Sequence, residues 1–293
     1  MKPSPFIYHR PASTSEALEM LADLGDAGKV LAGGQSLVPL MSMRLAAPAH
    51  LVDINHLPEL DTVEVTSTHV RVGAIARHSR VEKDATAYAA IPLLRQGLEN
   101  VAHPTIRNRG TTVGSIVHAD PAAEMPAVLA LLDGVVELRS ANDRREVAAA
   151  DFFVGPMESA TRPGELAVAA TFRRPPDGSG SAFLELARRH GDYAMCGVGA
   201  VVGTDPDGAV TNARVALISV GDGPVLVDVT PAVTGGGFDR AALNDLIDHD
   251  IDPEDDIHAT AEYRRHLAHV LTARTLEQAR ERAVTARRAG RAA

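Results

Sequence analysis

Two glycine-containing segments have the residue types needed to bind a phosphorylated ligand through the backbone. In the first, a short apolar run stops at two glycines and continues into apolar residues at helical spacing as far as Leu45. A strand that ends at glycines and leads into a helix leaves N–H groups unpaired at the positive end of the helix dipole, where anions bind. This first loop comprises Val30, Leu31, Ala32, Gly33, Gly34, Gln35, Ser36 and Leu37.

Two other interpretations of the first loop stay open. One is an ordinary strand-to-helix turn in which Gly33 and Gly34 supply positive φ angles and Ser36 caps the helix. The other is a dinucleotide-binding unit of the Rossmann type, because a strand ending in Asp53 follows about twenty residues later. That pattern requires a third glycine for close packing of helix on strand, and the segment 35–40 contains none.

The second segment, Gly110–Ser115, again combines glycines with hydroxyl residues. It offers N–H and O–H donors from Thr111, Thr112, Gly114 and Ser115. Charge-assisted hydrogen bonds contribute about 1.5–3 kcal/mol each, so four of them are large relative to the roughly −12 kcal/mol of nanomolar binding. We therefore expect this second loop to lie beside the first and to hold a diphosphate from the other side.

The elements around the first loop predict a small α/β unit. Strands at Phe6–Tyr8 and His50–Ile54 flank a helix that Ser13 and Glu16 begin with a capping box and that Gly25 ends.

The middle of the chain, from about Glu59, predicts strands and helices around the second loop. The expected elements are the strands Val63–Val65, Val70–Val72, Val135–Leu138 and Glu165–Phe172 and the helices Pro92–Asn100 and Pro121–Leu132. Proline is tolerated in the first turn of a helix, so Pro126 implies that the last helix begins near Ala123 or Glu124, or bends.

A linker at Arg174–Gly180 separates this part from the rest of the chain. Beyond it, the expected elements are the strands Phe183–Leu186, Val198–Val202 and Val210–Val220 and the helices Arg240–Ile247 and Thr260–Thr272. The tail, Thr275–Ala293, predicts a solvated helix or a frayed terminus, with a docking arm for an acidic partner as the alternative. Strands followed by helices indicate an α+β fold. We place three domains at residues 1–57, 58–174 and 181–293.

The amino-acid composition disfavours several classes of function. The 293 residues are 45% hydrophobic, and 38 acidic against 29 basic residues give a net charge of −9, which disfavours nucleic-acid binding. The longest apolar runs, such as Ala127–Leu132, are shorter than the roughly 20 residues of a membrane helix, and the N-terminal residues do not form a signal peptide, so we expect a cytoplasmic protein. The single cysteine, Cys196, is expected to be buried, and any iron–sulfur cluster needs another chain because it normally takes four thiolates.

Several motifs together resemble one family. They are Ala32–Leu37, Asn108–Thr111 with Gly114–Ser115, His118–Glu124, Arg188–Ala194 and Ala261–Arg265. This combination is similar to the FAD-binding medium subunit of molybdenum hydroxylases, which include aerobic carbon monoxide dehydrogenase and xanthine dehydrogenase. The resemblance implies a two-part PCMH-type FAD-binding region, formed by the small N-terminal α/β subdomain and a larger α+β subdomain, followed by a C-terminal domain of antiparallel sheet with helices.

The resemblance also implies roles for individual residues. The first loop, together with Thr111, Thr112, Gly114 and Ser115, corresponds to the segments that bind the FAD diphosphate. Val113 departs from the family, which usually has a glycine there. Further cofactor-binding positions are His118 within the third motif, Asp120 and Glu124 at the ribityl chain, Leu166 through its backbone at the flavin ring, and Tyr193 over the ring.

Each of these residues also has an ordinary structural explanation. Asp120 and Glu124 would cap a helix, Leu166 would be a core leucine, and Tyr193 would be a partly buried aromatic. We predict no catalytic residue, and His266 and His269 are interpreted as surface histidines because no metal-ligand set accompanies them.

The function implied is an electron-transfer subunit. It would take electrons from iron–sulfur clusters on a small subunit, in a complex whose large subunit carries molybdopterin, and pass them through FAD to an acceptor. A dimer of such three-chain units is implied. The alternatives are a free-standing FAD-dependent oxidoreductase and a nucleotide-binding module without redox activity.

Overall fold

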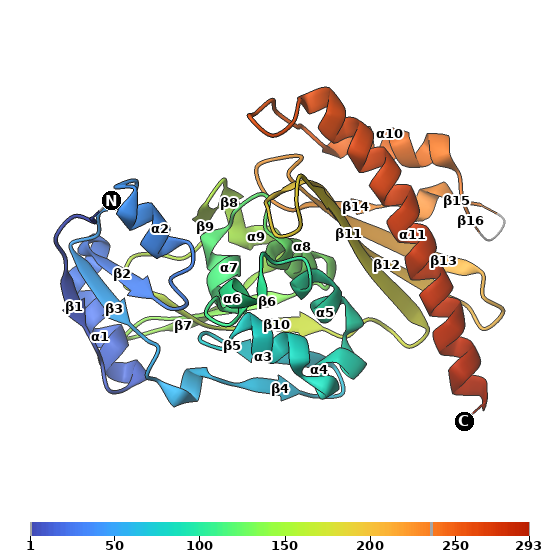
Figure 1. The fold of residues 1–293 in the computed structure, drawn as a ribbon. Coiled ribbons are helices and arrows are strands. Elements are labelled where there is room, and N and C mark those ends of the chain that lie inside the picture. Colours follow the sequence, from blue (N-terminus) through green and yellow to red (C-terminus); the bar gives the residue numbers. More distant parts are fainter. Residues whose placement is uncertain (1, 235–236, 293) are drawn as a thin grey trace.

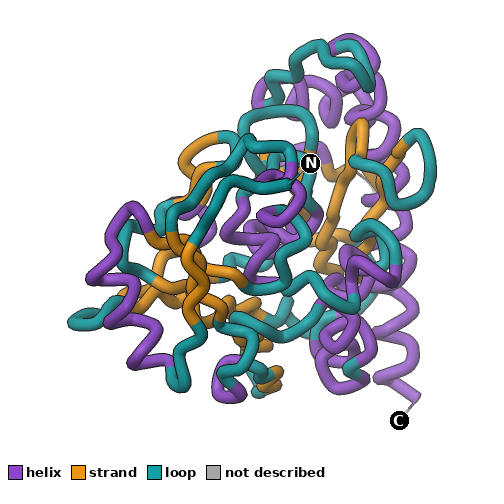
Figure 2. The backbone as a smooth tube through the Cα atoms, turned by 60° about the vertical axis from the view of Figure 1, so that its left-hand side comes forward, coloured by secondary structure: helices purple, strands orange, loops and turns teal. Residues whose placement is uncertain are grey.

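The computed structural model describes residues 2–234 and 237–292 and consists of three units in chain order, each built on its own main sheet (Figure 1). The N-terminal unit lies at one end of the molecule, and the long C-terminal helix covers the other end. Helices and strands are mixed in every part of the chain (Figure 2), which confirms the predicted α+β class.

The N-terminal unit is a parallel three-stranded sheet in the order β1-β3-β2. Its elements are β1 Ile7–His9, α1 Thr14–Leu24, β2 Gly28–Leu31, α2 Leu37–Ser42 and β3 His50–Asp53. Ser13 caps α1 by accepting a hydrogen bond from the Glu16 N–H at 3.2 Å, and Gly25 ends the helix with a φ of 50°. The Glu16 carboxylate accepts from Ala12 rather than from Ser13, so the predicted capping box forms on one side only.

The central unit is an antiparallel sheet in the order β4-β5-β10-β6-β7, with helices packed against it. Its strands are β4 Val63–Val65, β5 His69–Gly73, β6 Val135–Arg139, β7 Arg144–Ala148 and β10 Leu166–Arg173, with a small hairpin of β8 Phe153–Gly155 and β9 Glu158–Ser159. Its helices are α3 His78–Lys83, α4 Ala85–Ala90, α5 Pro92–Leu98, α6 Pro104–Arg107, α7 Thr112–His118, α8 Glu124–Leu131 and α9 Ala149–Phe152. Helix α8 begins at Glu124, as the position of Pro126 predicted, and residues 125–131 are all buried.

The C-terminal unit is an antiparallel sheet in the order β11-β12-β13-β14. Its elements are β11 Ser179–Ala187, β12 Ala194–Thr204, β13 Val210–Ile218, β14 Val225–Asp228, the short pair β15 Val233–Thr234 and β16 Gly237–Phe238, α10 Arg240–Asp250 and α11 Ala261–Ala292. Alternate residues of the sheet join different cores: Phe183 and Ile218 join the core of the central unit, whereas Ala182 and Leu217 join a core that includes residues of α10 and α11. The sheet is thus a layer between the central unit and α11.

Three sequence expectations differ from the structure. Helix α2 ends at Ser42 rather than near Leu45, because Arg44 adopts a positive φ of 61°. The predicted linker is shorter than expected, since β11 begins at Ser179 and pairs with Gly203 there.

The third difference is the tail, which is neither frayed nor fully solvated. Helix α11 continues to Ala292, and Leu276, Ala279 and Ala283 are buried on the side that faces β11 and β12. Apart from Leu276, the buried side chains named here are alanines, so the apolar periodicity that would have revealed this face is weak. The domain limits 1–57, 58–174 and 181–293 stay predictions.

Candidate functional site

The first loop connects β2 to α2 at the carboxyl end of the parallel sheet. Gly34 has a φ of 71°, a conformation that favours glycine. Ser36 occupies the N-cap position of α2, but its side chain makes no capping hydrogen bond. The interpretation of Ser36 as the side-chain cap of this helix was therefore wrong. Among the described residues, no hydrogen bond uses the backbone N–H groups of Gly33, Gly34, Gln35 or Ser36.

The second loop begins α7 and has fewer unused donors than the sequence suggested. Thr111 caps the helix, since its Oγ1 accepts from the Gly114 N–H at 3.1 Å, and the Ser115 N–H donates to the Thr111 carbonyl at 3.0 Å. The Thr112 hydroxyl lies 3.3 Å from Nδ1 of His78. Within the described residues, the N–H groups of Thr111 and Val113 are the loop amides that lack an acceptor.

The structure brings the two loops into direct contact. A Cβ atom at Gly33 would lie 2.5 Å from the carbonyl oxygen of Arg109, 2.7 Å from the Cα atom of Gly110 and 3.0 Å from the backbone nitrogen of Thr111. Only glycine allows such a close approach of two backbones. The unused amides of the first loop and the unused Thr111 amide are therefore near neighbours.

Asn55 and Arg77, which the sequence analysis did not single out, connect the loops through their side chains. Asn55 Nδ2 donates to the Ala32 carbonyl at 2.8 Å. The Arg77 guanidinium donates to Asn55 Oδ1 at 2.6 Å and to the Arg109 carbonyl at 2.5 Å. In the sequence, Asn55 could have been noticed because it lies two residues after Asp53, where a strand ends. Nothing in the sequence pointed to Arg77.

The carboxyl residues of the third motif lie between α7 and α8. Asp120 is buried and accepts a hydrogen bond from the Ala122 N–H at 2.9 Å, which is the turn-capping role considered from the sequence. Glu124 begins α8, but its side chain accepts no hydrogen bond from another described residue. Burial, followed by the neighbouring charges of Glu185 and Asp120, raises the pKa of Glu124 to about 8. His118 is the last residue of α7.

Glu185 is a second carboxyl group in this region that sequence analysis missed. It lies on β11 two residues after Phe183, so both side chains are on the face directed toward the central unit. Its Oε2 atom is buried without a hydrogen-bond partner, and burial raises the pKa of the carboxyl group to about 7. A glutamate at an inward position of an apolar strand was the available signal.

Tyr193 and Leu166 differ in their exposure. Tyr193 is 64% exposed, and partial burial of the phenol together with the charges of Asp120 and Glu124 raises its pKa. This places Tyr193 near the carboxyl residues. The Leu166 side chain is buried in the core of the N-terminal unit, which leaves only its backbone for a ligand.

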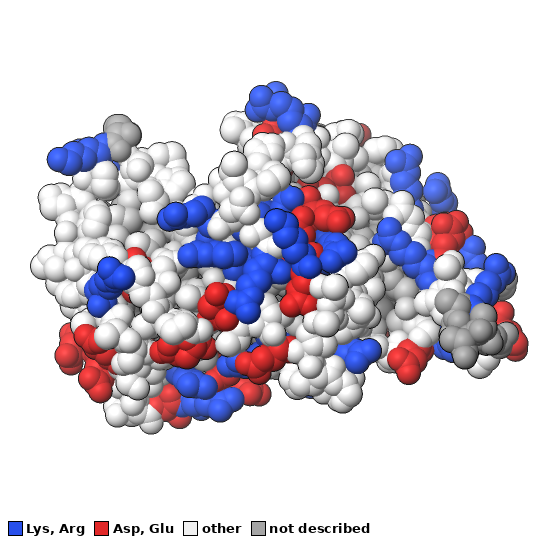
Figure 3. Space-filling view, turned by 60° about the horizontal axis from the view of Figure 1, so that its bottom comes forward, with Lys and Arg blue, Asp and Glu red and all other residues white. Residues whose placement is uncertain are grey.

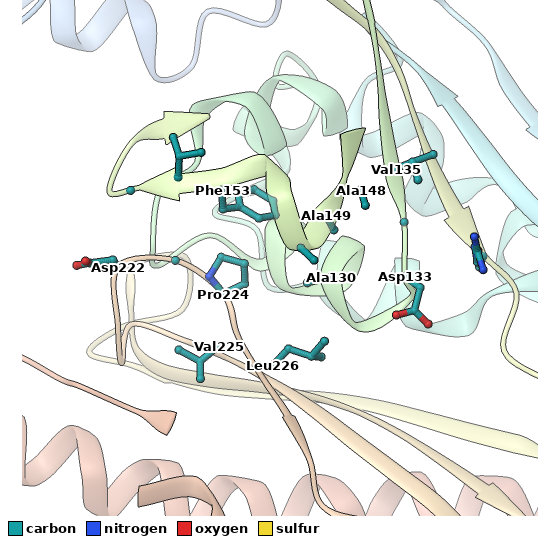
Figure 4. A pocket seen from close by; sticks show the side chains of 16 residues that line it. Ala130, Asp133, Val135, Ala148, Ala149, Phe153, Asp222, Pro224, Val225 and Leu226 are labelled. Carbon is teal, nitrogen blue, oxygen red and sulfur yellow. The ribbon is translucent and has the colours of Figure 1, made fainter. Parts of the chain in front are cut away.

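The cavity shown in Figure 4 lies elsewhere. It has a volume of about 550 Å³, and Phe153, Val225 and Leu226 contribute apolar side chains to its lining, with Asp133 and Asp222 also among the lining residues. None of the predicted cofactor-binding residues lines it. It is therefore a separate feature from the loop contact.

Surface charges of both signs are interspersed. On the face in Figure 3, Lys and Arg gather near the middle and acidic residues border them. Exposed ion pairs such as Arg80–Asp61 at 2.5 Å and Arg265–Asp248 at 2.8 Å contribute to the surface charge. No group of three or more metal-ligating side chains occurs among the residues the structure describes, and His269 pairs with Asp248 at 2.9 Å.

These residues fit a flavin nucleotide. Unused amides meet at the loop contact, and the carboxyl residues Asp120 and Glu124 follow α7 in the chain. A diphosphate accepts hydrogen bonds, whereas ribityl hydroxyls can donate them to carboxylates. Donors at the loop contact and carboxyl acceptors near the start of α8 are compatible with such a cofactor, and the fold and site indicate a flavin-nucleotide-binding protein.

Comparison with known proteins gives the family. Residues 4–172 match the FAD binding domain in molybdopterin dehydrogenase, and residues 181–279 match the CO dehydrogenase flavoprotein C-terminal domain. The chain belongs to this family of molybdopterin dehydrogenase FAD-binding proteins.

Similar proteins span the whole chain. It is 38% identical over 287 residues to the 6-hydroxypseudooxynicotine dehydrogenase complex subunit alpha of Paenarthrobacter nicotinovorans, covering 97% of both chains. It is 36% identical to the carbon monoxide dehydrogenase medium chain of Afipia carboxidovorans, covering 97% of this chain and 99% of the relative. A solved carbon monoxide dehydrogenase structure from Hydrogenophaga pseudoflava matches with a TM-score of 0.91 at 33% identity, covering 96% and 99% of the two chains.

Proposed function

We propose that this chain is the FAD-binding electron-transfer subunit of a molybdenum-containing hydroxylase or dehydrogenase. It would receive electrons from iron–sulfur clusters on a small partner subunit and pass them to an acceptor. A bound flavin can exchange electrons singly or in pairs, which suits a position between clusters and an acceptor. The observation that carries the proposal is the contact of Gly33 with Arg109–Thr111, which places unused amides of two distant loops together.

The residues of the chain divide into three groups by their proposed contacts. The first loop with Thr111, Thr112, Gly114 and Ser115 holds the diphosphate, chiefly through the unused N–H groups of the first loop and of Thr111. Asp120 and Glu124 accept hydrogen bonds from the ribityl chain, with His118 nearby. The backbone of Leu166 and the exposed ring of Tyr193 contact the flavin ring.

The proposal includes two partner chains. Cys196 is buried and burial raises its pKa to about 12, so the single cysteine of the chain is a poor metal ligand. Relatives are named as a complex subunit and as a medium chain. We propose an iron–sulfur small subunit, a molybdopterin large subunit and a heterohexamer formed by two heterotrimers, which size-exclusion chromatography of the co-expressed chains would test.

Location is a separate part of the proposal. No helix among the described residues has the length and apolar character needed to span a membrane. A cytoplasmic location stays a prediction, and fractionation of cells that produce the complex would test it.

The substitution Gly33→Ala tests the loop contact directly. Its Cβ atom would meet the Arg109 carbonyl at 2.5 Å, so the loops must separate and the dissociation constant for FAD should rise at least about 100-fold. Gly155→Ala is the matched control, because its Cβ would find its nearest neighbour at 3.6 Å. The measurement is quenching of flavin fluorescence during titration of the full chain with FAD.

Two outcomes would contradict the proposed function. Unchanged FAD affinity in folded Gly33→Ala would show that the diphosphate lies elsewhere. Absence of any FAD binding by the parent chain, with no flavin absorbance near about 450 nm after purification, would favour a non-redox nucleotide-binding module.

A further inference from the structure

Asn55 is hydrogen-bonded to the last carbonyl groups before Gly33. Its Nδ2 atom lies 2.8 Å from the Ala32 carbonyl oxygen and 3.4 Å from that of Leu31. The Asp53 carboxylate holds the asparagine in place, since Oδ1 accepts from the Asn55 backbone N–H at 2.9 Å and from Nδ2 at 2.6 Å. The Ala32 carbonyl and the Gly33 N–H belong to one planar peptide unit, so fixing the carbonyl also fixes the direction of the N–H.

Arg77 is anchored at the second loop and reaches the first. Its backbone forms an isolated antiparallel bridge with Thr111, supported by hydrogen bonds from His78 N–H to the Gly110 carbonyl at 2.9 Å and from Thr112 N–H to the Ala76 carbonyl at 3.3 Å. Its side chain binds Asn55 Oδ1 and the Arg109 carbonyl, and the latter is also the atom nearest to a Cβ at Gly33.

Asp53 and Arg77 carry opposite charges in this hydrogen-bonded connection. Burial alone would raise the pKa of Asp53, but hydrogen bonds from Tyr8 and Asn55 outweigh it, so the pKa is lowered and the carboxylate is ionised at neutral pH. Burial and the nearby Arg109 lower the pKa of Arg77, while Asp61 and Asp53 oppose that change. A guanidinium group stays charged under these conditions.

We propose that Asn55 and Arg77 are positioning residues that set the spacing of the two loops and the direction of the Gly33 N–H group. This inference rests on the proposed function, because it assumes that the FAD diphosphate binds at the loop contact. Neither side chain needs to contact FAD. Together with Asp53 they form a continuous chain of hydrogen bonds from the N-terminal sheet to the second loop, across the boundary between two units of the fold.

The substitution Arg77→Ala tests this connection in the full chain, titrated with FAD and monitored by flavin fluorescence. Loss of two charge-assisted hydrogen bonds that preorganise the loops should raise the FAD dissociation constant about 10- to 100-fold. Arg80→Ala is the matched control, because the Arg80 side chain also donates to a backbone carbonyl, that of Asp61 at 2.7 Å, and among the described residues it contacts neither loop. Its dissociation constant should stay within about 2-fold of the parent value.

A double-mutant cycle separates positioning from a general structural role. Asn55→Ala alone should weaken FAD binding about 10-fold, and the double variant with Arg77→Ala should be no weaker than Arg77→Ala alone, because both substitutions break the same connection. Arg77→Lys keeps the charge but replaces the planar guanidinium, with its fixed donor geometry, by a single ammonium group, so it should recover part of the affinity. The melting temperature of each FAD-free chain is measured alongside, and Arg77→Lys with Asn55→Ala completes the test if Arg77→Ala does not fold.

Two results would overturn the inference. One is an FAD affinity within about 2-fold of the parent in folded Arg77→Ala, and the other is independent, multiplying effects of the Asn55 and Arg77 substitutions. If Gly33→Ala weakens binding in the same assay, the loop site stands and only the positioning role fails. If Gly33→Ala has no effect, the proposed function itself fails.

Discussion

At the loop contact, the side chains of Asp53, Asn55 and Arg77 hydrogen-bond to one another and to loop carbonyls, whereas the carboxyl groups of Glu124 and Glu185 accept no hydrogen bond from another described residue. The first region is braced without a ligand. In the second, a buried oxygen of Glu185 has no hydrogen-bond partner and the half-buried Glu124 carboxyl accepts only from its own backbone, which is costly until donors arrive from outside. The difference indicates that one end of the proposed FAD site is preorganised and that the other becomes satisfied only on binding.

The largest effect is expected from Val113→Gly, which introduces the residue usual in the family. Val113 is 2% exposed in the central core, so its loss should reduce the free energy of unfolding by about 3 kcal/mol, including the cost of glycine within α7. FAD affinity of the folded chain should change less than about 3-fold, since Thr111 and Gly114 keep the loop shape. Urea unfolding and FAD titration measure the two effects.

The matched control is Val154→Gly, because Val154 lies in β8 and is 57% exposed. It should cost clearly less stability than Val113→Gly. Tighter FAD binding by Val113→Gly without loss of stability would show that the valine distorts the second loop. The loop contact would then not be preorganised.

A smaller effect on stability, which depends on pH, is expected in the region of Glu124 and Glu185. The pKa of Glu124 is raised from 4.5 to about 8, so between these values the folded chain retains a proton that the unfolded chain releases. Stability of the FAD-free chain should therefore fall as the pH rises from 5 to 8, by about 2 kcal/mol after allowance for partial exposure. Glu124→Gln should remove its share of this loss and leave the share from Glu185, whose pKa is raised to about 7, as measured by urea unfolding at both pH values.

Glu146→Gln is the control for that experiment, because Glu146 is 60% exposed and lies 3.7 Å from Arg144. It should leave the pH dependence as in the parent chain. Saturation with FAD should also reduce the pH dependence if ribityl hydroxyls donate to Glu124. If Glu124→Gln loses as much stability as the parent between pH 5 and pH 8, the contrast between the loop contact and the region of Glu124 and Glu185 is refuted.

The smallest effect is expected from Tyr193→Phe. The tyrosine is 64% exposed, so removing its hydroxyl should change stability by less than about 0.5 kcal/mol. Its pKa is raised above 10.0 by burial and by Asp120 and Glu124, so the variant should lose a tyrosine that ionises late in an alkaline absorbance titration. Tyr263→Phe, on α11, is the control, and loss of an early-ionising tyrosine in Tyr193→Phe would contradict the assignment.

The sequence predicted the elements better than the connections between them. Strand and helix periodicity identified β4, β5, β10 and the C-terminal sheet, and Pro126 indicated the start of α8. Glycine-broken turns at Gly33 and Gly110 identified the loops, because local chemistry determines unpaired amides. Asn55 and Arg77 could not be found this way, since their roles depend on which backbone atoms the fold brings within reach.

The region of Glu124 and Glu185 could likewise be predicted only in part from the sequence. Glu124 stood out through its motif, but its pKa is raised first by burial and then by the charge of Glu185, which comes from a different unit of the fold. Relatives at 38% and 36% identity are named for 6-hydroxypseudooxynicotine and for carbon monoxide, so chains this similar occur in proteins named for different substrates.

The last turns of α11 also determine how the chain can be handled. The backbone of Ala279 and Ala283 leaves no space for a side chain at Gly180, and Arg287 donates to Thr204 Oγ1 at 3.1 Å and to the Asp177 carbonyl at 3.4 Å. The arginine- and alanine-rich end of the chain therefore fastens the connection between the FAD-binding region and the C-terminal sheet. Removing these turns would delete the contacts with Asp177, Gly180 and Thr204 and uncover the strand face beneath them, so a truncated chain should be less stable than the full one.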